Sequence, residues 1–216
     1  DWKSIVELTE KRLDGAKDGW WEEFVDTYKE VIKLGGEFAA EEIDPRAAKM
    51  DETGVHMVDG KVIEPKEHKE IFEKLKEMGM YGIITPTELG GMNAPGLVYL
   101  LVCESMARAD VSVMTHFGFH VTTISTLLNY SMHEGSTKWD ADGNITETRW
   151  NDVIQEIQAG DAWGAMDLTE PDAGSDLAAL RTRAVKDDEG VWRVTGNKIF
   201  ITSGHAKHHF VLAKTE

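Results

Sequence analysis

The sequence is poor in cysteine and has no long apolar run. Cys103 is the single cysteine among 216 residues, so no intrachain disulfide can form and we expect a reducing, cytoplasmic location. It lies in the apolar run LVYLLVCESMA, and we interpret it as a small buried side chain. No apolar segment reaches the roughly 18 residues that a membrane span requires, and the charged start DWKSIVELTEKR is unlike a secretory signal.

Positive charge is also scarce, because 23 Lys and Arg face 39 Asp and Glu, which gives a net charge of −16. Phosphate groups would be repelled at long range, which argues against nucleic acids and anionic membranes as partners. Apolar residues make up 41% of the chain and include seven Trp and seven Phe, enough to bury a core. The chain lacks an initiator Met and stops on the strand-like run FVLAKTE, so we expect it to be a piece of a longer protein.

Up to about residue 160 the apolar residues follow helical spacing. The segment EPKEHKEIFEKLKEMG predicts an amphipathic helix with Pro65 at its start and Gly79 at its end. A stripe from Trp20 to Ile32 predicts an earlier helix that ends at Gly35-Gly36. Two segments, LVYLLVCESMARA and VSVMTHFGFHVTTISTLL, are apolar over much of their circumference, which is typical of helices at the centre of a bundle.

Polar, turn-rich sequence separates these helices. We expect loops over YGIITPTELGGMNAPG and a surface excursion over residues 131–150, followed by one short helix in NDVIQEIQAG. After Asp161 the period changes to two, and TRAVK, VWRVT and KIFIT predict three antiparallel strands joined by DDEG and by Gly196-Asn197. HFVLAK adds a fourth strand. The sequence therefore predicts an α+β fold, with a helical bundle over residues 1–160 and an incomplete antiparallel β domain over residues 161–216.

Two segments of the β domain carry the residue types of a ligand site. AMDLTEPDAGSD, residues 165–176, offers hydroxyls and small residues, and Gly174 permits close backbone approach. KIFITSG, residues 198–204, places Phe200 and Thr202 two residues apart, which in a strand puts both on one face. Taken alone, the first segment is more typical of an ordinary turn and the second of a packed strand.

The combination resembles the acyl-CoA dehydrogenase family. TEPDAGSD, followed about twenty residues later by GNKIFITSG, is similar to the two flavin-contacting signatures of that family. IDPRAAKMDETG, MGMYGIITPTELGG and ESMARADVSV resemble its amino-terminal helical domain in the same order, so the likeness runs from about residue 37 to the end. The long stretch at 131–150 and the extended amino terminus suggest one of the larger bacterial branches.

The resemblance implies FAD between a helical domain and a middle β-barrel, with an acyl-CoA thioester on the other side of the flavin ring. Thr169 would lie near the pyrimidine edge of the ring, and Thr202 would reach toward N5. Phe200 would pack on the ring where many relatives have Trp, and Ser175 would serve FAD or the CoA portion of the substrate. The full set of implied cofactor residues is Met166, Leu168, Thr169, Ser175, Phe200, Ile201 and Thr202.

In this family a carboxylate removes the α-proton while the β-hydrogen passes to the flavin as hydride, which yields the trans-2-enoyl-CoA. The resemblance places that carboxylate in a carboxy-terminal helical domain that this chain does not contain. No residue here is assigned as the base, and we expect Glu170 to be a structural carboxylate. Electron-transfer flavoprotein is the implied acceptor, and a homodimer or homotetramer the implied assembly. The sequence does not specify the acyl chain length.

Metal sites receive little support from residue spacing. His116 and His120 are four apart on a predicted helix, but no third ligand stands near them in the sequence, and we expect no metal. His205, His208 and His209 are interpreted as solvated or interface residues. Asp187-Asp188-Glu189-Gly190 fits a hairpin turn better than a calcium loop.

Three other functions remain open at this point. The same fold could serve as an acyl-CoA oxidase or flavin monooxygenase, which would react rapidly with oxygen. A non-catalytic relative could bind flavin and act as a binding or protective module, although the acidic charge opposes a DNA-binding version. An isolated helical interaction domain would leave the paired motifs unexplained.

Overall fold

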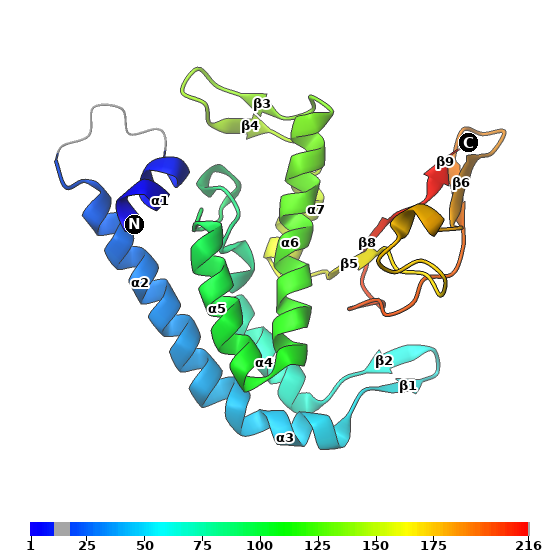
Figure 1. The fold of residues 1–216 in the computed structure, drawn as a ribbon, viewed down its shortest axis with the longest axis horizontal. Coiled ribbons are helices and arrows are strands. Elements are labelled where there is room, and N and C mark those ends of the chain that lie inside the picture. The colour runs from blue at the N-terminus through cyan, green and yellow to red at the C-terminus, as the bar shows by residue number, and fades with distance from the viewer. Residues whose placement is uncertain (11–17, 216) are drawn as a thin grey trace. The chain divides into compact units, whose positions relative to one another are not determined.

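The structure is a computed structural model that describes residues 1–10 and 18–215. It divides into two compact units, Asp1–Asp161 and Ala162–Glu216, which are described separately below (Figure 1). Positions 11 and 12 of the charged amino-terminal segment lie outside the described residues. In the part of the chain that is described, no helix combines the length and the apolarity needed to cross a bilayer.

The first unit consists mainly of helices, as the sequence predicted. They are α1 (Trp2–Thr9), α2 (Trp21–Phe38), α3 (Asp44–Thr53), α4 (Lys66–Glu77), α5 (Gly96–Ala109), α6 (Val111–His133) and α7 (Asn151–Gln158). A π-helical turn, η1 (Ala39–Ile43), joins α2 to α3, and two 3₁₀ turns, η2 (Met80–Gly82) and η3 (Thr87–Leu89), precede α5. Two hairpins complete the unit: β1 (His56–Val58) with β2 (Lys61–Ile63), and β3 (Lys138–Trp139) with β4 (Ile145–Glu147).

Helices α5 and α6 carry much of the core of this unit. Asp110 separates them, and its carboxylate caps α6 by accepting hydrogen bonds from the amides of Ser112 and Val113. Cys103 of α5 is buried, as predicted. The side chains of α6 that are fully enclosed are Val113, Phe117, His120, Val121, Ile124 and Ser131. Burial on several sides therefore holds for α6, whereas α5 buries one face and leaves Leu97 and Leu100 exposed at 41% and 61%, so the expectation of all-round burial was wrong for α5.

Helix α2 continues through Gly35 and Gly36 to Phe38, so the prediction that it ends at the glycine pair was wrong. The physical reason is packing against α5. A Cβ atom on Gly35 would lie 3.0 Å from both γ carbons of Val102, which shows how closely the two helices approach there. Gly35 permits this contact rather than breaking the helix, and the cost of glycine in a helix, about 1 kcal/mol, is offset by packing.

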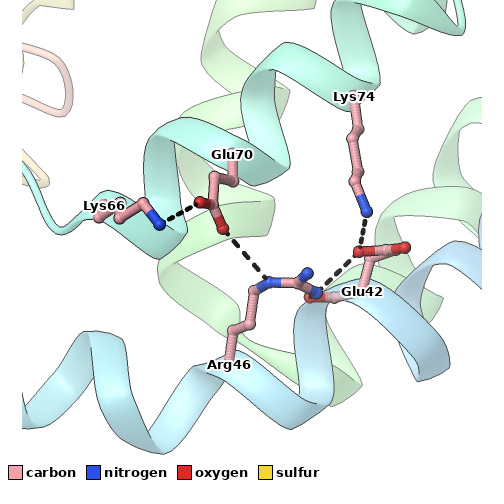
Figure 2. A network of polar contacts seen from close by, with 5 residues as sticks. All are labelled: Glu42, Arg46, Lys66, Glu70 and Lys74. Carbon is pink, nitrogen blue, oxygen red and sulfur yellow. Dashed lines mark hydrogen bonds and ion pairs between the residues drawn. The ribbon is translucent and has the colours of Figure 1, made fainter.

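A network of charged side chains joins the π-helical turn and α3 to α4 (Figure 2). Arg46 Nη1 lies 2.7 Å from Glu42 Oε2, and Lys74 of α4 also pairs with that carboxylate. Lys66 Nζ lies 2.9 Å from Glu70 Oε1, and the Arg46 guanidinium reaches the same carboxylate at 4.0 Å. The ammonium of Lys74 is the largest cause of the lowered pKa of Glu42. The network fixes the side-by-side placement of the two segments.

Helix α4 follows its sequence prediction closely. Pro65 stands immediately before it as the cap residue, and the buried side chains Ile71, Phe72 and Leu75 form the expected apolar face. Gly79 adopts the left-handed conformation, with φ of 68°, that ends the helical segment. Residues 131–150 include the β3–β4 hairpin, which the sequence analysis expected only as a polar surface excursion.

The described residues of the second unit, 162–215, form two small sheets. Its strands are β5 (Gly164–Asp167), β6 (Arg183–Lys186), β7 (Trp192–Thr195), β8 (His208–Val211) and β9 (Lys214–Thr215), with a 3₁₀ turn, η4 (Leu177–Ala179). The predicted hairpin of β6 and β7 is confirmed, with Asp187 at its turn accepting hydrogen bonds from the amides of Glu189 and Val191. The hairpin reading of this acidic segment therefore holds.

The strand expected over HFVLAK, residues 209–214, is found in part as β8, whereas the strand expected over KIFIT and the wholly antiparallel pairing were wrong. Residues 198–202 do not form a strand, because Phe200 and Ser203 both have φ of 58°, outside the β region. Strand β8 pairs with β5, and β9 with β6, and both pairs are parallel rather than antiparallel. No closed barrel forms among residues 162–215. Pairing between strands about forty residues apart cannot be read from the alternation of a single segment.

Candidate functional site

The two motif segments meet in the second unit. Strand β5 ends at Asp167, and the chain continues through Leu168 and Thr169 into the polar loop. The amide of Ile199 donates a hydrogen bond to the carbonyl of Thr169, with an N···O distance of 3.0 Å. This bond joins residues 165–176 to residues 198–204. The sequence predicted this meeting only through the family resemblance.

Lys198 strengthens the same junction. Its ammonium donates to the carbonyl of Leu168 and to Oε1 of Glu170, both at 2.9 Å. The side chains of Lys198 and Glu170 are only 10% and 6% exposed, so both charges are largely withdrawn from water. Withdrawn charges of this kind require partners, which explains why the lysine reaches across to the other segment.

Glu170 is held by the backbone of the segment before β6. The amides of Arg181 and Thr182 donate to its two carboxylate oxygens at 2.6 and 3.0 Å. Hydrogen bonds from Thr182, then from the Arg181 amide, lower the pKa of Glu170 to about 2, and Lys198 adds to the effect. The carboxylate is therefore ionised at neutral pH and fully engaged. These contacts give it the structural role expected from the sequence and make it a poor proton acceptor.

A small cavity of about 190 Å³ lies beside this junction. It is lined by Glu170, Pro171, Asp172, Arg181, Thr182, Gly196 and Asn197. Gly196 lies so close to Thr182 that an added Cβ would be 2.8 Å from the Thr182 Cα atom. Because residue 196 has no side chain, the backbone that follows β7 can pack directly against Thr182, whose amide binds Glu170.

A second polar contact ties β5 to β8. Nδ1 of His209 lies 2.9 Å from Oδ2 of Asp167, and Nε2 of the same ring lies 2.8 Å from the carbonyl oxygen of Ala206. His209 is exposed, in agreement with its interpretation from the sequence as a solvated or interface residue, and it also pairs with Asp167 inside its own unit. The parallel register of β5 and β8 brings the two side chains together.

The residues predicted to contact a cofactor differ in exposure. Met166, Leu168 and Thr169 are half-buried, and Ser175 in the following turn is exposed. Phe200 is 89% exposed, and the next two residues are half-buried. Because residues 198–202 are not a strand, the expectation that Phe200 and Thr202 share a strand face was wrong. The predicted residues in order are Met166, Leu168, Thr169, Ser175, Phe200, Ile201 and Thr202.

Sequence reasoning missed Lys198 and the pair of Asp167 with His209. One available signal was the single lysine at the head of the apolar run KIFIT, since a lysine next to a buried segment needs an acidic partner. In the structure that partner is Glu170 of the other motif segment. The Asp167–His209 contact had no comparable signal, because it depends on the parallel pairing of β5 with β8.

The two histidines that are four apart on α6 do not face one site. His120 is fully buried, and its Nε2 donates to the carbonyl of Ile157 at 2.9 Å. Burial lowers the pKa of His120 to about 4, so the ring is neutral at physiological pH. It is a core residue that joins α6 to α7. His116 lies in a different group of residues, with Glu64 and His68.

The chain matches two family models. They are the acyl-CoA dehydrogenase N-terminal domain, over residues 26–142, and the acyl-CoA dehydrogenase middle domain, over residues 165–216. A 3-methylmercaptopropionyl-CoA dehydrogenase of Ruegeria pomeroyi is 32% identical over 199 residues, which are 88% of this chain and 31% of that protein. The chain spans less than half the length of this relative.

Solved structures agree with this match. Butyryl-CoA dehydrogenase from Megasphaera elsdenii is 26% identical, with a TM-score of 0.66 over 88% of this chain and 45% of that chain. An acyl-CoA dehydrogenase from Bacillus anthracis, solved in complex with FAD, shares the fold at 21% identity, with a TM-score of 0.67 over 88% of this chain and 29% of that one. Because the N-terminal domain model alone covers more than half of the residues, the chain belongs to the acyl-CoA dehydrogenase family.

Proposed function

We propose that the protein of which this chain forms part is an FAD-dependent dehydrogenase that converts an acyl-CoA thioester to the trans-2-enoyl-CoA. The observation that carries the proposal is the junction of the two motif segments, made by the Ile199–Thr169 hydrogen bond and by Lys198. Membership of the family and the FAD complex of a protein with the same fold add support.

The donor set of the junction fits a flavin. Thr169 and Thr202 carry hydroxyl groups suited to the nitrogen and oxygen atoms at the edge of an isoalloxazine ring. Phe200 offers an aromatic face that is 89% exposed, and a planar ring packed on it would withdraw both surfaces from water. Met166, Leu168 and Ile201 supply apolar contacts, and Ser175 is assigned to FAD or to the CoA portion of the substrate.

FAD when bound supplies the acceptor for the hydride that leaves the β-carbon of the substrate. The residues of this chain bind and orient, and none of them is assigned as the base that removes the α-proton. Glu170 is unsuited to that task, because its pKa of about 2 and its backbone and lysine partners hold it ionised in a structural position. Its function is to fix the first segment so that Thr169 is presented in one orientation.

Several finer properties belong to the same proposal and rest on the family resemblance. The division near residue 161 would separate the helical domain from the middle domain, and the strands of the second unit would form part of a larger β-barrel. Electron-transfer flavoprotein would be the acceptor, the assembly would be a homodimer or homotetramer, and the location would be cytoplasmic. The long 131–150 segment would place the protein in one of the larger bacterial branches.

The decisive experiment mixes the full-length protein anaerobically with a panel of acyl-CoA thioesters and follows flavin absorbance. The proposal expects yellow protein as purified and bleaching with at least one thioester, together with enoyl-CoA formation. A colourless protein that cannot be reconstituted with FAD would contradict it. Rapid peroxide formation by the reduced protein, without an added acceptor, would instead support the oxidase alternative.

A further inference from the structure

Three potential metal ligands from separate parts of the sequence meet in the helical unit. Glu64 lies just before α4, His68 is in the first turn of α4, and His116 is in the second turn of α6. One ligand atom from each lies within 4.8 Å of the other two. No third ligand for His116 could be predicted from the spacing of nearby residues, because the partners come from a segment about fifty residues earlier.

The contacts within this group are close. Nδ1 of His68 lies 3.6 Å from Oε2 of Glu64, and the centroids of the His68 and His116 rings are 5.1 Å apart. Among the described residues, that Nδ1 atom is buried and has no hydrogen-bond partner. Phe72 packs against both imidazoles, at centroid distances of 4.5 and 4.8 Å, and forms an apolar wall on one side.

We propose that Glu64, His68 and His116 bind a divalent transition-metal cation of the zinc class. Two imidazoles and one carboxylate are a common ligand set for Zn²⁺ and Co²⁺, with a water molecule in the fourth position. Ligand atoms around such an ion lie about 3.3–3.5 Å apart, given metal–ligand bonds of about 2.0–2.1 Å. The present separations therefore require a contraction of about 1 Å, which side-chain rotation of the half-buried Glu64 and His68 can supply.

Charge decides how much each ligand contributes. His68 lies in the first turn of α4, where the helix dipole opposes a cation. The carboxylate of Glu64 offsets this unfavourable field, so its charge matters more than its size. The net charge of −16 also raises the local concentration of divalent cations around the protein. Glu64→Gln should therefore weaken binding as strongly as loss of an imidazole.

The inferred role of the cation is to join the start of α4 to α6. A ligand that binds only the folded protein stabilises it by mass action, about 100-fold when present at 100 times its dissociation constant. This role is independent of the proposed flavin chemistry, because all three ligands lie in the helical unit and none belongs to the two motif segments. Failure of either proposal would leave the other intact.

The test is a Co²⁺ titration of the purified protein after removal of bound metal by a chelator. We expect one equivalent of Co²⁺ to bind, with visible d–d absorption that Zn²⁺ displaces, and with a higher melting temperature. Each of Glu64→Gln, His68→Gln and His116→Gln should weaken binding at least about 10-fold. The matched controls Glu67→Gln, in the first turn of α4, and His133→Gln, in the last turn of α6, should leave it unchanged.

His68→Gln and Glu64→Gln are the safer variants, because their side chains are partly exposed and folding can be checked by circular dichroism. Absence of Co²⁺ binding to the wild-type protein would overturn the inference. So would binding that survives these two variants, or binding that is lost in either control, since both results would place the cation elsewhere.

Discussion

Replacing Gly196 with alanine tests whether the junction of the two motif segments depends on close backbone packing. An added Cβ would lie 2.0 Å from Oγ1 of Thr182, 2.6 Å from its Cβ and 2.8 Å from its Cα. Rotation of the Thr182 side chain can relieve only the first contact. The Cβ and Cα atoms can retreat only if the backbone moves by about 1 Å to reach ordinary van der Waals distance.

Thr182 cannot move that far without losing partners. Its amide donates to Glu170 at 3.0 Å, and its carbonyl accepts from the amide of Lys214 at 2.9 Å. Overpacking of this kind costs about 1–3 kcal/mol, and one lost backbone hydrogen bond adds about 1 kcal/mol. We therefore expect Gly196→Ala to lower the free energy of unfolding by about 2–4 kcal/mol, and the urea midpoint by about 1–2 M.

Gly174→Ala is the matched control, because no atom lies within 4 Å of the Cβ that it would add. Urea unfolding would give the stability of both variants, and hydrogen exchange measured by mass spectrometry would report the protection of residues 181–199. Gly196→Ala should lose protection there and retain less FAD. If its midpoint equals that of Gly174→Ala, the close approach to Thr182 does not hold the junction, and the reasoning is refuted.

Three further changes probe other parts of the molecule. Burial holds the pKa of His120 near 4 against an ordinary 6.5, so the free energy of unfolding should fall by about 3 kcal/mol as the pH drops from 6.5 to 4. In urea titrations at several pH values, His120→Gln should lack this dependence of stability on pH. Phe200→Ala should weaken FAD binding about 3- to 10-fold in equilibrium dialysis, with unchanged stability because the ring is 89% exposed, and Phe200→Trp should restore it. Gly35→Ala should destabilise by about 1 kcal/mol, because its Cβ would meet Val102 at 3.0 Å, whereas Gly36→Ala, in open space, should stabilise by about 0.5–1 kcal/mol in the same urea assay.

The helices could be predicted because each carries its own signal. The apolar face of α4, its proline at the start and its left-handed glycine at the end are all local features, and they appear in the structure as expected. The glycine pair in α2 shows the limit of this reasoning. A glycine can break a helix or admit a neighbouring one, and only the position of Val102 decides between the two.

The second unit was harder to predict because its pairings are non-local. Residues 198–202 have strand-like composition, but the Ile199 amide bonds to Thr169 and Phe200 takes a positive φ. The alternation of apolar and polar residues in one segment indicates that the segment prefers an extended backbone. It does not indicate which other strand the segment will pair with. The parallel pairs of β5 with β8 and of β6 with β9 follow from this second choice.

Glu170 and Lys198 illustrate how the same limits apply to a site. Each lies in a motif that the sequence singled out, and the sequence predicted a structural role for Glu170 but none for Lys198, because neither segment alone shows the contact between them. A buried pair of this kind contributes little net stability over an apolar pair, but loss of either partner leaves an uncompensated charge. The pair therefore acts mainly by specifying one arrangement of the two segments.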